Sequence, residues 1–311
     1  MRAVSIAAVW TFGWVVALLS EQSPSFKSGV SLVTVPVSVI PADGAEPTRT
    51  LTPADVHVLE DGRPQSISFV EVDTRPLSVA VVLDVSSSML GLAREWAAAA
   101  LREVAARLGP EDEMCLVVFG AWAIVPVSWT RVGQIDGVDW GQWVLPSSTA
   151  LLDAVQVSIA LMDKASNPRG VVLVLSDGLE LVSATPLSDV VTTRRQSETE
   201  VHAFALDPLR DSEGRAQPPL WARKTPWGEP MPDYLRELAG DSGGLVHRIR
   251  DISGVRDRAE AFVSGLKSQF LVGYSSNRAL DGRYRRIKVE PTRHGVRIRH
   301  RGGYLAMPAT D

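Results

Sequence analysis

A continuous apolar run that ends in an aspartate and two spaced hydroxyls constrains this chain more than any other feature. Residues 79–83 are Val-Ala-Val-Val-Leu, and Asp84, Ser86 and Ser88 follow. Such a run is typical of a parallel strand that is buried on both faces. Ligands of open α/β sheets bind beyond the carboxyl ends of the strands, where hard oxygen donors suit a hard cation such as Mg²⁺. This segment therefore predicts a fold class, the place of a site and the kind of ligand.

Strand-like and helical patterns alternate from residue 76 to residue 268, which predicts a doubly wound, Rossmann-like α/β domain. Residues 208–232, rich in Pro, Arg and Trp, are expected to form a long surface loop within it. Strands are expected at 78–84, 113–119, 123–129, 171–175, 201–206 and 244–249, and helices at 90–108, 149–164, 187–197, 233–240 and 255–269.

Alternating strand patterns also lie on both sides of this domain. We expect those within residues 26–75 to pair with those within residues 269–311 in one small β-sandwich. The α/β domain would then be an insertion in a discontinuous β domain, or be flanked by its strands. Pro36 marks the first of these strands as an edge strand, because proline has no N–H to donate.

The first residues have the pattern of an export signal. Arg2 precedes an apolar segment over residues 3–19, and polar residues follow at 20–23. This is typical of a signal peptide, expected over residues 1–25, whose cleavage point the sequence does not mark. The protein is therefore expected to be secreted or periplasmic. An uncleaved N-terminal membrane anchor, with the protein facing outside the cytoplasm, is the alternative.

Composition narrows the classes of function. The net charge of −4 argues against nucleic acid as a partner, and the five histidines show no zinc-ligand spacing. The single cysteine, Cys115, lies in a strand-like run and is expected in the core.

Three arginines alternate along one predicted strand near the end of the sequence, Arg297, Arg299 and Arg301, which predicts a solvated face. Contact of that face with an anionic envelope surface is the alternative.

Two later segments place further oxygen donors on the same predicted edge of the sheet. Thr149 ends a cluster of three hydroxyl residues directly before a predicted helix, and Asp177 follows the buried run at 171–175. Both are expected on the edge that carries Asp84, since ligand sites of such sheets lie beyond the strands' carboxyl ends. Helix caps and turns are the structural alternative for these side chains.

Together these positions resemble a known metal site. The pattern is similar to the five-position metal-ion-dependent adhesion site of von Willebrand factor A domains, with Asp84, Ser86, Ser88, Thr149 and Asp177 at the five positions. The resemblance implies direct coordination of Mg²⁺, or of Mn²⁺ or Ca²⁺, by the three hydroxyls. It also implies that the two aspartates act mainly through bound waters.

The resemblance extends beyond the site. Residues 52–62, 175–178, 269–274 and 299–304 resemble a bacterial subfamily, the von Willebrand factor A-related domain of acidobacterial type. Neutral hydroxyls neutralise a dication poorly, so the ion would favour a carboxylate from a partner protein. The resemblance thus implies an extracytoplasmic module for protein binding or adhesion, not an enzyme.

Two other functions stay open. One is a structural envelope component in which the metal only braces loops. The other is a metal-dependent hydrolase, although the chain has no Gly-x-Ser-x-Gly and no His-Glu-x-x-His motif.

Four side chains are further candidates around the site. Asp153 is a candidate for orienting it, with a solvated helix position as the alternative. Glu180 is a candidate for the rim of the site, with an ordinary surface position as the alternative. Trp140 and Trp143 are candidates for flanking the metal face as partner anchors, with ordinary packing as the alternative.

Overall fold

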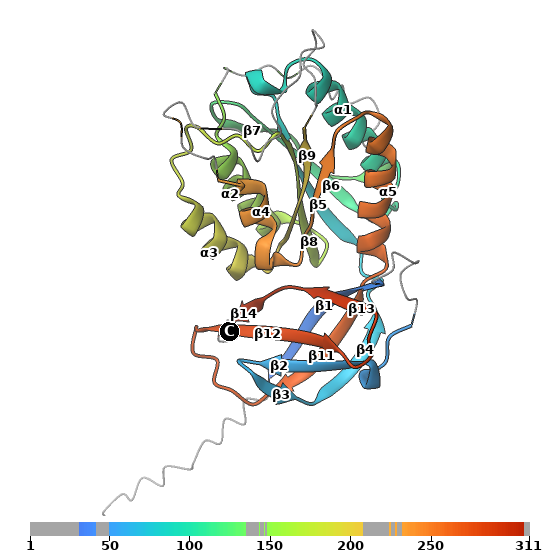
Figure 1. Cartoon of the computed structure of the whole chain (residues 1–311). Helices are drawn as coiled ribbons and strands as arrows, with labels where there is room; N and C mark the ends of the chain where they lie inside the picture. The colour runs from blue at the N-terminus through green and yellow to red at the C-terminus, as the bar shows by residue number, and fades with distance from the viewer. Residues whose placement is uncertain are drawn as a thin grey trace, which may run out of the picture.

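The computed structural model describes residues 31–41, 50–134, 143, 146, 148–207, 224, 228 and 232–307. Within these residues, an α/β domain stands on a β-sandwich (Figure 1). The predicted α/β class and the sandwich built from both ends of the chain are confirmed. Among the described helices, none is long and apolar enough to cross a membrane. The predicted signal segment and most of the predicted loop at 208–232 lie outside the described residues.

The central sheet of the α/β domain has the strand order β10-β9-β8-β5-β6-β7. Five strands are parallel, and β7 runs antiparallel to β6, so the sheet is mixed. Only residues 120–122 join β6 to β7, which is too short for a crossover and forces a hairpin. The strands are β5 (Leu77–Asp84), β6 (Glu113–Phe119), β7 (Ala123–Arg131), β8 (Arg169–Ser176), β9 (Glu200–Leu206) and β10 (Val246–Ile249).

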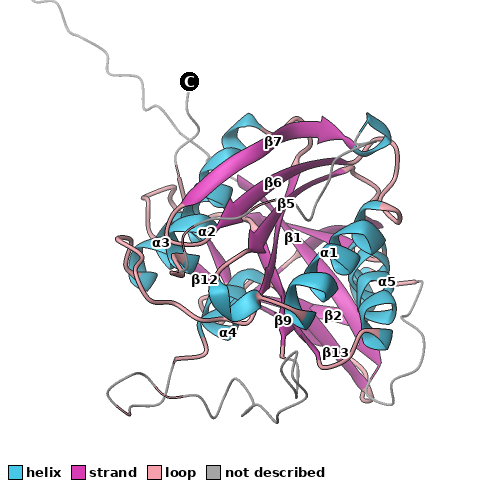
Figure 2. Ribbon diagram, turned by 90° about the horizontal axis from the view of Figure 1, so that it is seen from above, coloured by secondary structure: helices cyan, strands magenta, loops and turns pink. Residues whose placement is uncertain are grey.

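Helices cover both faces of this sheet (Figures 1 and 2), with α1 and α5 on one face and α2, α3 and α4 on the other. Every residue of β5 is buried, as its apolar run predicts. Cys115 is buried in β6, and this burial raises the pKa of its thiol to about 12. The helices are α1 (Leu92–Ala105), α2 (Leu151–Leu161), α3 (Leu187–Ser197), α4 (Tyr234–Ala239) and α5 (Ser253–Lys267).

The β-sandwich consists of two antiparallel four-stranded sheets, ordered β13-β1-β11-β4 and β14-β12-β2-β3. Each sheet joins strands from before and after the insertion, and their valines, Tyr274 and Ile287 form one shared core. The strands are β1 (Ser31–Pro41), β2 (Val56–Glu60), β3 (Arg63–Gln65), β4 (Ile67–Val72), β11 (Phe270–Ser276), β12 (Tyr284–Pro291), β13 (Val296–His300) and β14 (Gly303–Leu305).

The prediction that the first strand lies at an edge is wrong. Strand β1 has β11 on one side and β13 on the other. Its residues 31–37 pair with β11, whereas pairing with β13 begins only at Val37. Pro36 therefore lies where one side of the strand is unpaired, and the missing N–H is tolerated there.

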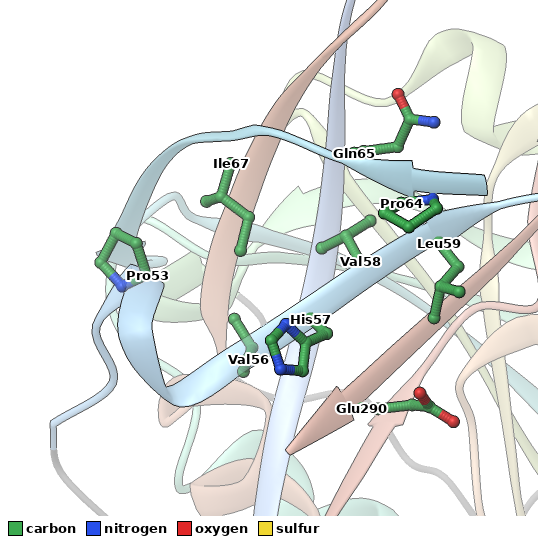
Figure 3. A pocket seen from close by; sticks show the side chains of 9 residues that line it. All are labelled: Pro53, Val56, His57, Val58, Leu59, Pro64, Gln65, Ile67 and Glu290. Atoms are coloured by element: carbon green, nitrogen blue, oxygen red, sulfur yellow. The ribbon is translucent and has the colours of Figure 1, made fainter. Parts of the chain in front are cut away.

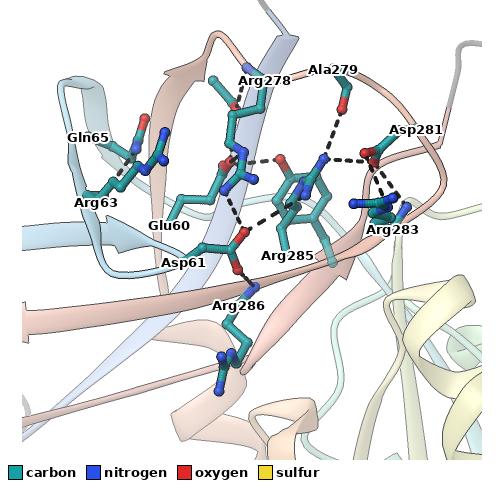
Figure 4. A network of polar contacts seen from close by, with 12 residues as sticks. Glu60, Asp61, Arg63, Gln65, Arg278, Ala279, Asp281, Arg283, Arg285 and Arg286 are labelled. Atoms are coloured by element: carbon teal, nitrogen blue, oxygen red, sulfur yellow. Dashed lines mark hydrogen bonds and ion pairs between the residues drawn. The ribbon is translucent and has the colours of Figure 1, made fainter.

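A buried carboxylate links the two sheets of the sandwich. Glu60, at the end of β2, is fully buried and accepts hydrogen bonds from three hydroxyls: Tyr274 at 2.8 Å, Ser276 at 3.1 Å and Tyr304 at 3.1 Å. Figure 4 shows Glu60 within a wider polar network beside Arg278. Since Tyr274 and Ser276 belong to β11 in the opposite sheet, the carboxylate helps to fix how one sheet stacks on the other.

Arg169, the first residue of β8, contacts both chain segments that connect the α/β domain to the β-sandwich. Its guanidinium lies 3.3 Å from the Asp73 carboxylate. It also donates hydrogen bonds of 2.8 Å to the Leu266 carbonyl and to the Gln269 side chain. Asp73 precedes β5 and Gln269 follows α5, and the Asp73 N–H donates to the Gln269 carbonyl at 2.9 Å. This buried cluster anchors the insertion at the amino-terminal end of its sheet.

The predicted solvated arginine face holds only in part. Arg297 is exposed, but Arg299 is half-buried and Arg301 is buried. Arg301 forms an ion pair with Glu198, just after α3, and donates to the Thr34 carbonyl at 2.8 Å. This part of the face is covered because it packs against the α/β domain, which the strand pattern alone does not reveal.

Removing the Arg169 guanidinium should destabilise the protein strongly. We expect Arg169→Ala to cost about 3 kcal/mol or more, because it leaves the Leu266 carbonyl and the Gln269 side-chain oxygen without this donor and removes a buried positive charge beside Asp73. Urea unfolding measures this cost. Arg131→Ala, which breaks the exposed ion pair with Glu111, is the matched control and should cost less than about 1 kcal/mol. Equal urea midpoints for the two variants would contradict the anchoring role.

Candidate metal site at the carboxyl edge of the sheet

The sequence-predicted site residues come from two neighbouring strands and the start of one helix. Asp84 is the last residue of β5, and Asp177 directly follows β8, which pairs with β5 in parallel. Thr149 lies two residues before α2. Because the Arg169 cluster lies at the amino-terminal end of these strands, this carboxyl edge faces away from the β-sandwich (Figure 1). The β-sandwich therefore does not cover this edge.

Asp84 is a fully buried carboxylate with two hydrogen-bond donors. The Ser86 N–H donates to it at 2.9 Å, and the Ser176 hydroxyl at 2.6 Å. Burial, and then repulsion from Asp177, raise the pKa of Asp84 to about 7, although the hydrogen bonds oppose this shift. The edge thus concentrates negative charge in a place where it is poorly solvated.

The two serines after Asp84 lie side by side. Ser86 is buried, Ser88 is exposed, and their hydroxyl oxygens are 3.1 Å apart. The short 3-10 helix η2 (Ser87–Met89) bends the chain here. One hydroxyl of the pair therefore faces the interior and the other faces solvent.

The Thr149 loop is tied to the loop that follows Asp177. Thr149 is buried, and its carbonyl accepts hydrogen bonds from the N–H groups of Leu181 at 2.9 Å and Val182 at 3.2 Å. The next residue, Ala150, donates to the Gly120 carbonyl at 2.7 Å. Backbone hydrogen bonds thus fix the loops of the site relative to one another. Coordination of an ion by the five residues stays a prediction.

Ser176 is a residue that the strand pattern did not mark as functional. Its hydroxyl donates to Asp84 and accepts from the Gly178 N–H at 2.9 Å, so it links the ends of β5 and β8. Gly178 has a φ of +80°, and a Cβ there would lie 3.1 Å from Leu235. The signal was present in the Ser-Asp-Gly sequence after a buried strand, since a hydroxyl and a glycine there suit a tight turn.

The carboxylates of Asp153 and Glu180 brace the loops. Glu180 is half-buried and accepts from the N–H of Leu152 at 2.9 Å and of Ser183 at 2.8 Å. Asp153 accepts from the Thr185 N–H at 2.8 Å. Burial opposes ionisation of Asp153, but these hydrogen bonds outweigh it and lower its pKa. Both side chains fasten residues 180–185 to the start of α2.

Trp143 packs against the core, which was predicted as the alternative to anchoring a partner. It is half-buried and lies against the core on the α1 face of the sheet. Arg94 donates to its carbonyl at 3.1 Å and to the Val85 carbonyl at 3.0 Å, which fixes the loop after β5. Trp140 lies outside the described residues.

The donors at this edge fit a hard divalent cation. All the predicted ligands carry oxygen, and Asp84 and Asp177 bring negative charge that a dication would neutralise. In the part of the chain that the structure describes, no group of three or more His, Cys, Asp or Glu side chains is arranged to hold a metal. Ligands beyond the two aspartates would therefore be hydroxyls and water.

A cavity elsewhere has different chemistry. An open hollow of about 430 Å³ lies in the β-sandwich, over β2 and its connection to β4. Figure 3 shows the side chains that line it. Its lining includes His57 and Glu290 but is otherwise mainly apolar, with Val56, Leu59 and Ile67. It lies outside the α/β domain and shares no residue with the carboxyl edge.

Comparisons with known proteins gave distant similarities. No family model matches the chain. Inter-alpha-trypsin inhibitor heavy chain H2 of Sus scrofa is 24% identical over 213 residues, which is 64% of this chain. The chain spans about a fifth of that relative's length, since the match covers 21% of it.

Among solved structures, a von Willebrand factor type A protein from Catenulispora acidiphila is 12% identical, with a TM-score of 0.46 over 91% of this chain and 75% of that one. BatB from Bacteroides thetaiotaomicron is 15% identical, with a TM-score of 0.44 over 61% and 99%. Proximal thread matrix protein 1 from the mussel byssus, described with a zinc-occupied MIDAS motif, is 16% identical, with a TM-score of 0.47 over 66% and 48%.

The raised pKa of Asp84 should make the stability of the metal-free protein depend on pH. The unfolded chain releases this proton near pH 3.8 and the folded protein near pH 7, so the contribution of Asp84 is fully present below pH 3.8. It should be lost as the pH rises to 7, by about 4 kcal/mol. Urea unfolding in EDTA, with Asp84→Asn as the reference, measures this loss. A difference between the two proteins that stays constant with pH would contradict it.

Proposed function

We propose that this chain, whose inserted domain is of the von Willebrand factor A type, is an extracytoplasmic module that binds a partner protein through a divalent cation. The single observation that carries the proposal is the placement of buried Asp84 and Asp177 beside the paired hydroxyls of Ser86 and Ser88. This placement combines buried negative charge with neutral oxygen donors, which suits Mg²⁺ or Mn²⁺.

Each residue has a distinct part in the proposed site. Ser86, Ser88 and Thr149 hold the ion through their hydroxyls, and Asp84 and Asp177 hold its bound waters. Ser176 and the Ser86 N–H orient the Asp84 carboxylate, as outer-shell groups do in other metal sites. The bound ion supplies positive charge, since neutral hydroxyls cancel little of it.

The chemistry of such a site favours binding. Ser88 is exposed, so a group from another molecule has access to the ion's open side. An oxygen anion is the natural ligand for a hard, poorly neutralised dication, and an Asp or Glu side chain of a partner supplies one. We assign the site no catalytic step.

We also propose that the protein acts outside the cytoplasm. The proposal depends on the signal-like sequence of residues 2–23. Export, either to the periplasm or beyond, would bring the domain to partners at the cell surface. An uncleaved N-terminal segment would instead tether it to the membrane.

Thr149→Val should weaken binding of Mg²⁺ or Mn²⁺ at least about tenfold, because it removes a ligand hydroxyl and keeps the side-chain shape. Isothermal titration calorimetry of the EDTA-stripped chain measures this. Thr130→Val is the matched control: its hydroxyl bonds the Ser128 carbonyl on β7, and the variant should bind as the wild type does. No divalent binding by the wild type, or equal binding by Thr149→Val, would overturn the proposal.

Partner capture should depend on the ion. The full chain serves as bait for proteins extracted from outside the cytoplasm, and mass spectrometry identifies what it captures. We expect a partner protein to be captured in the presence of Mg²⁺ and to be lost in EDTA or when the bait is Thr149→Val. Capture that is indifferent to EDTA would show that the ion only braces loops. Metal-dependent turnover of generic ester or phosphate substrates that Asp84→Ala abolishes would show an enzyme instead.

A further inference from the structure

Large apolar side chains stand exposed on the loops around the candidate metal site. Leu90 is 62% exposed, Leu181 53%, Val182 50% and Trp122 50%. We call these four residues the apolar rim. Apolar side chains of this size are usually covered, and several on one face commonly mark an interaction site.

Backbone hydrogen bonds connect each loop of the apolar rim to the site. Leu90 donates its N–H to the Ser87 carbonyl at 3.2 Å, within the loop of the two serines. Leu181 and Val182 donate theirs to the Thr149 carbonyl. Trp122 lies in the turn at 120–122, which accepts from Ala150 through the Gly120 carbonyl. The four side chains therefore belong to three loops that meet at the same edge.

These loops are held in place by charged groups that turn inward. Glu180 and Asp153 bond the N–H groups of α2 and of residues 183–185. Arg94 bonds the carbonyls of Val85 and Trp143. These three charged side chains thus fix the backbone of the loops, and the apolar side chains stay exposed on a preorganised surface.

We propose that the apolar rim selects a partner segment in which one Asp or Glu is flanked closely by aliphatic or aromatic side chains. This proposal rests on the function proposed above, because the carboxylate would meet the ion while its neighbours cover the rim. Burial of apolar area around a charged contact also excludes water, which strengthens that contact.

Two blocked pentapeptides test the selection on the full chain. One has a central glutamate flanked by leucine and phenylalanine on each side, and the other has the glutamate flanked by serines. In Mg²⁺, we expect the apolar-flanked peptide to bind at least about tenfold more tightly. Exchange of its glutamate for glutamine, or addition of EDTA, should abolish most of that binding.

Variants locate the effect on the apolar rim. The double variant Leu181→Ser, Val182→Ser and the single variant Trp122→Ser should lose most of the preference and keep the wild-type affinity for Mn²⁺ by calorimetry. Leu32→Ser, which removes an equally exposed side chain from β1 of the sandwich, should keep the preference.

The outcomes separate the two proposals. If the chain binds Mn²⁺ but holds both peptides equally, or neither, the rim proposal fails and the metal site stands. If it binds no divalent cation, the proposed function itself fails. If the apolar peptide binds equally well in EDTA, the rim is an apolar surface without a carboxylate requirement, and the stated selection is overturned.

Discussion

Burial of two carboxylates at one edge of a sheet is the constraint on which the rest of this structure depends. Asp84 ends a strand that is buried along its whole length, and Asp177 follows the neighbouring strand. Ionised groups without water are costly unless an opposite charge or hydrogen bonds compensate. Ser176 and the Ser86 N–H compensate only in part, as the raised pKa of Asp84 shows. The proposed cation would add a positive charge beside the two carboxylates.

The arrangement of the domains follows from the same strands. Arg169 anchors the amino-terminal end of the sheet to the β-sandwich, and the candidate site lies at the other end of β5. Eight residues of strand separate these ends by about 25 Å. The sandwich, stacked around Glu60, therefore acts as a base that presents the carboxyl edge outward. This placement leaves the candidate site away from the sandwich, as the proposed capture of a partner would need.

Local patterns predicted most of the fold, because continuous apolar runs mark buried strands and helical spacing marks their crossovers. They also placed Asp84, Thr149 and Asp177 at one edge, since parallel strands end there together. The features that the patterns missed depend on partners far away in sequence. Glu180 turns inward toward Leu152, Arg301 is covered through Glu198, and β1 gains a second neighbour from the far end of the chain. No short window of sequence contains such partners.

A divalent cation held between the hydroxyls of Ser86, Ser88 and Thr149 would be seen most directly by anomalous diffraction from crystals of the full chain grown with Mn²⁺. We expect one strong anomalous peak at the carboxyl edge, within coordination distance of these three hydroxyl oxygens. Crystals that contain Mn²⁺ but show no peak there, or show it only at another place on the protein, would contradict the proposed metal site.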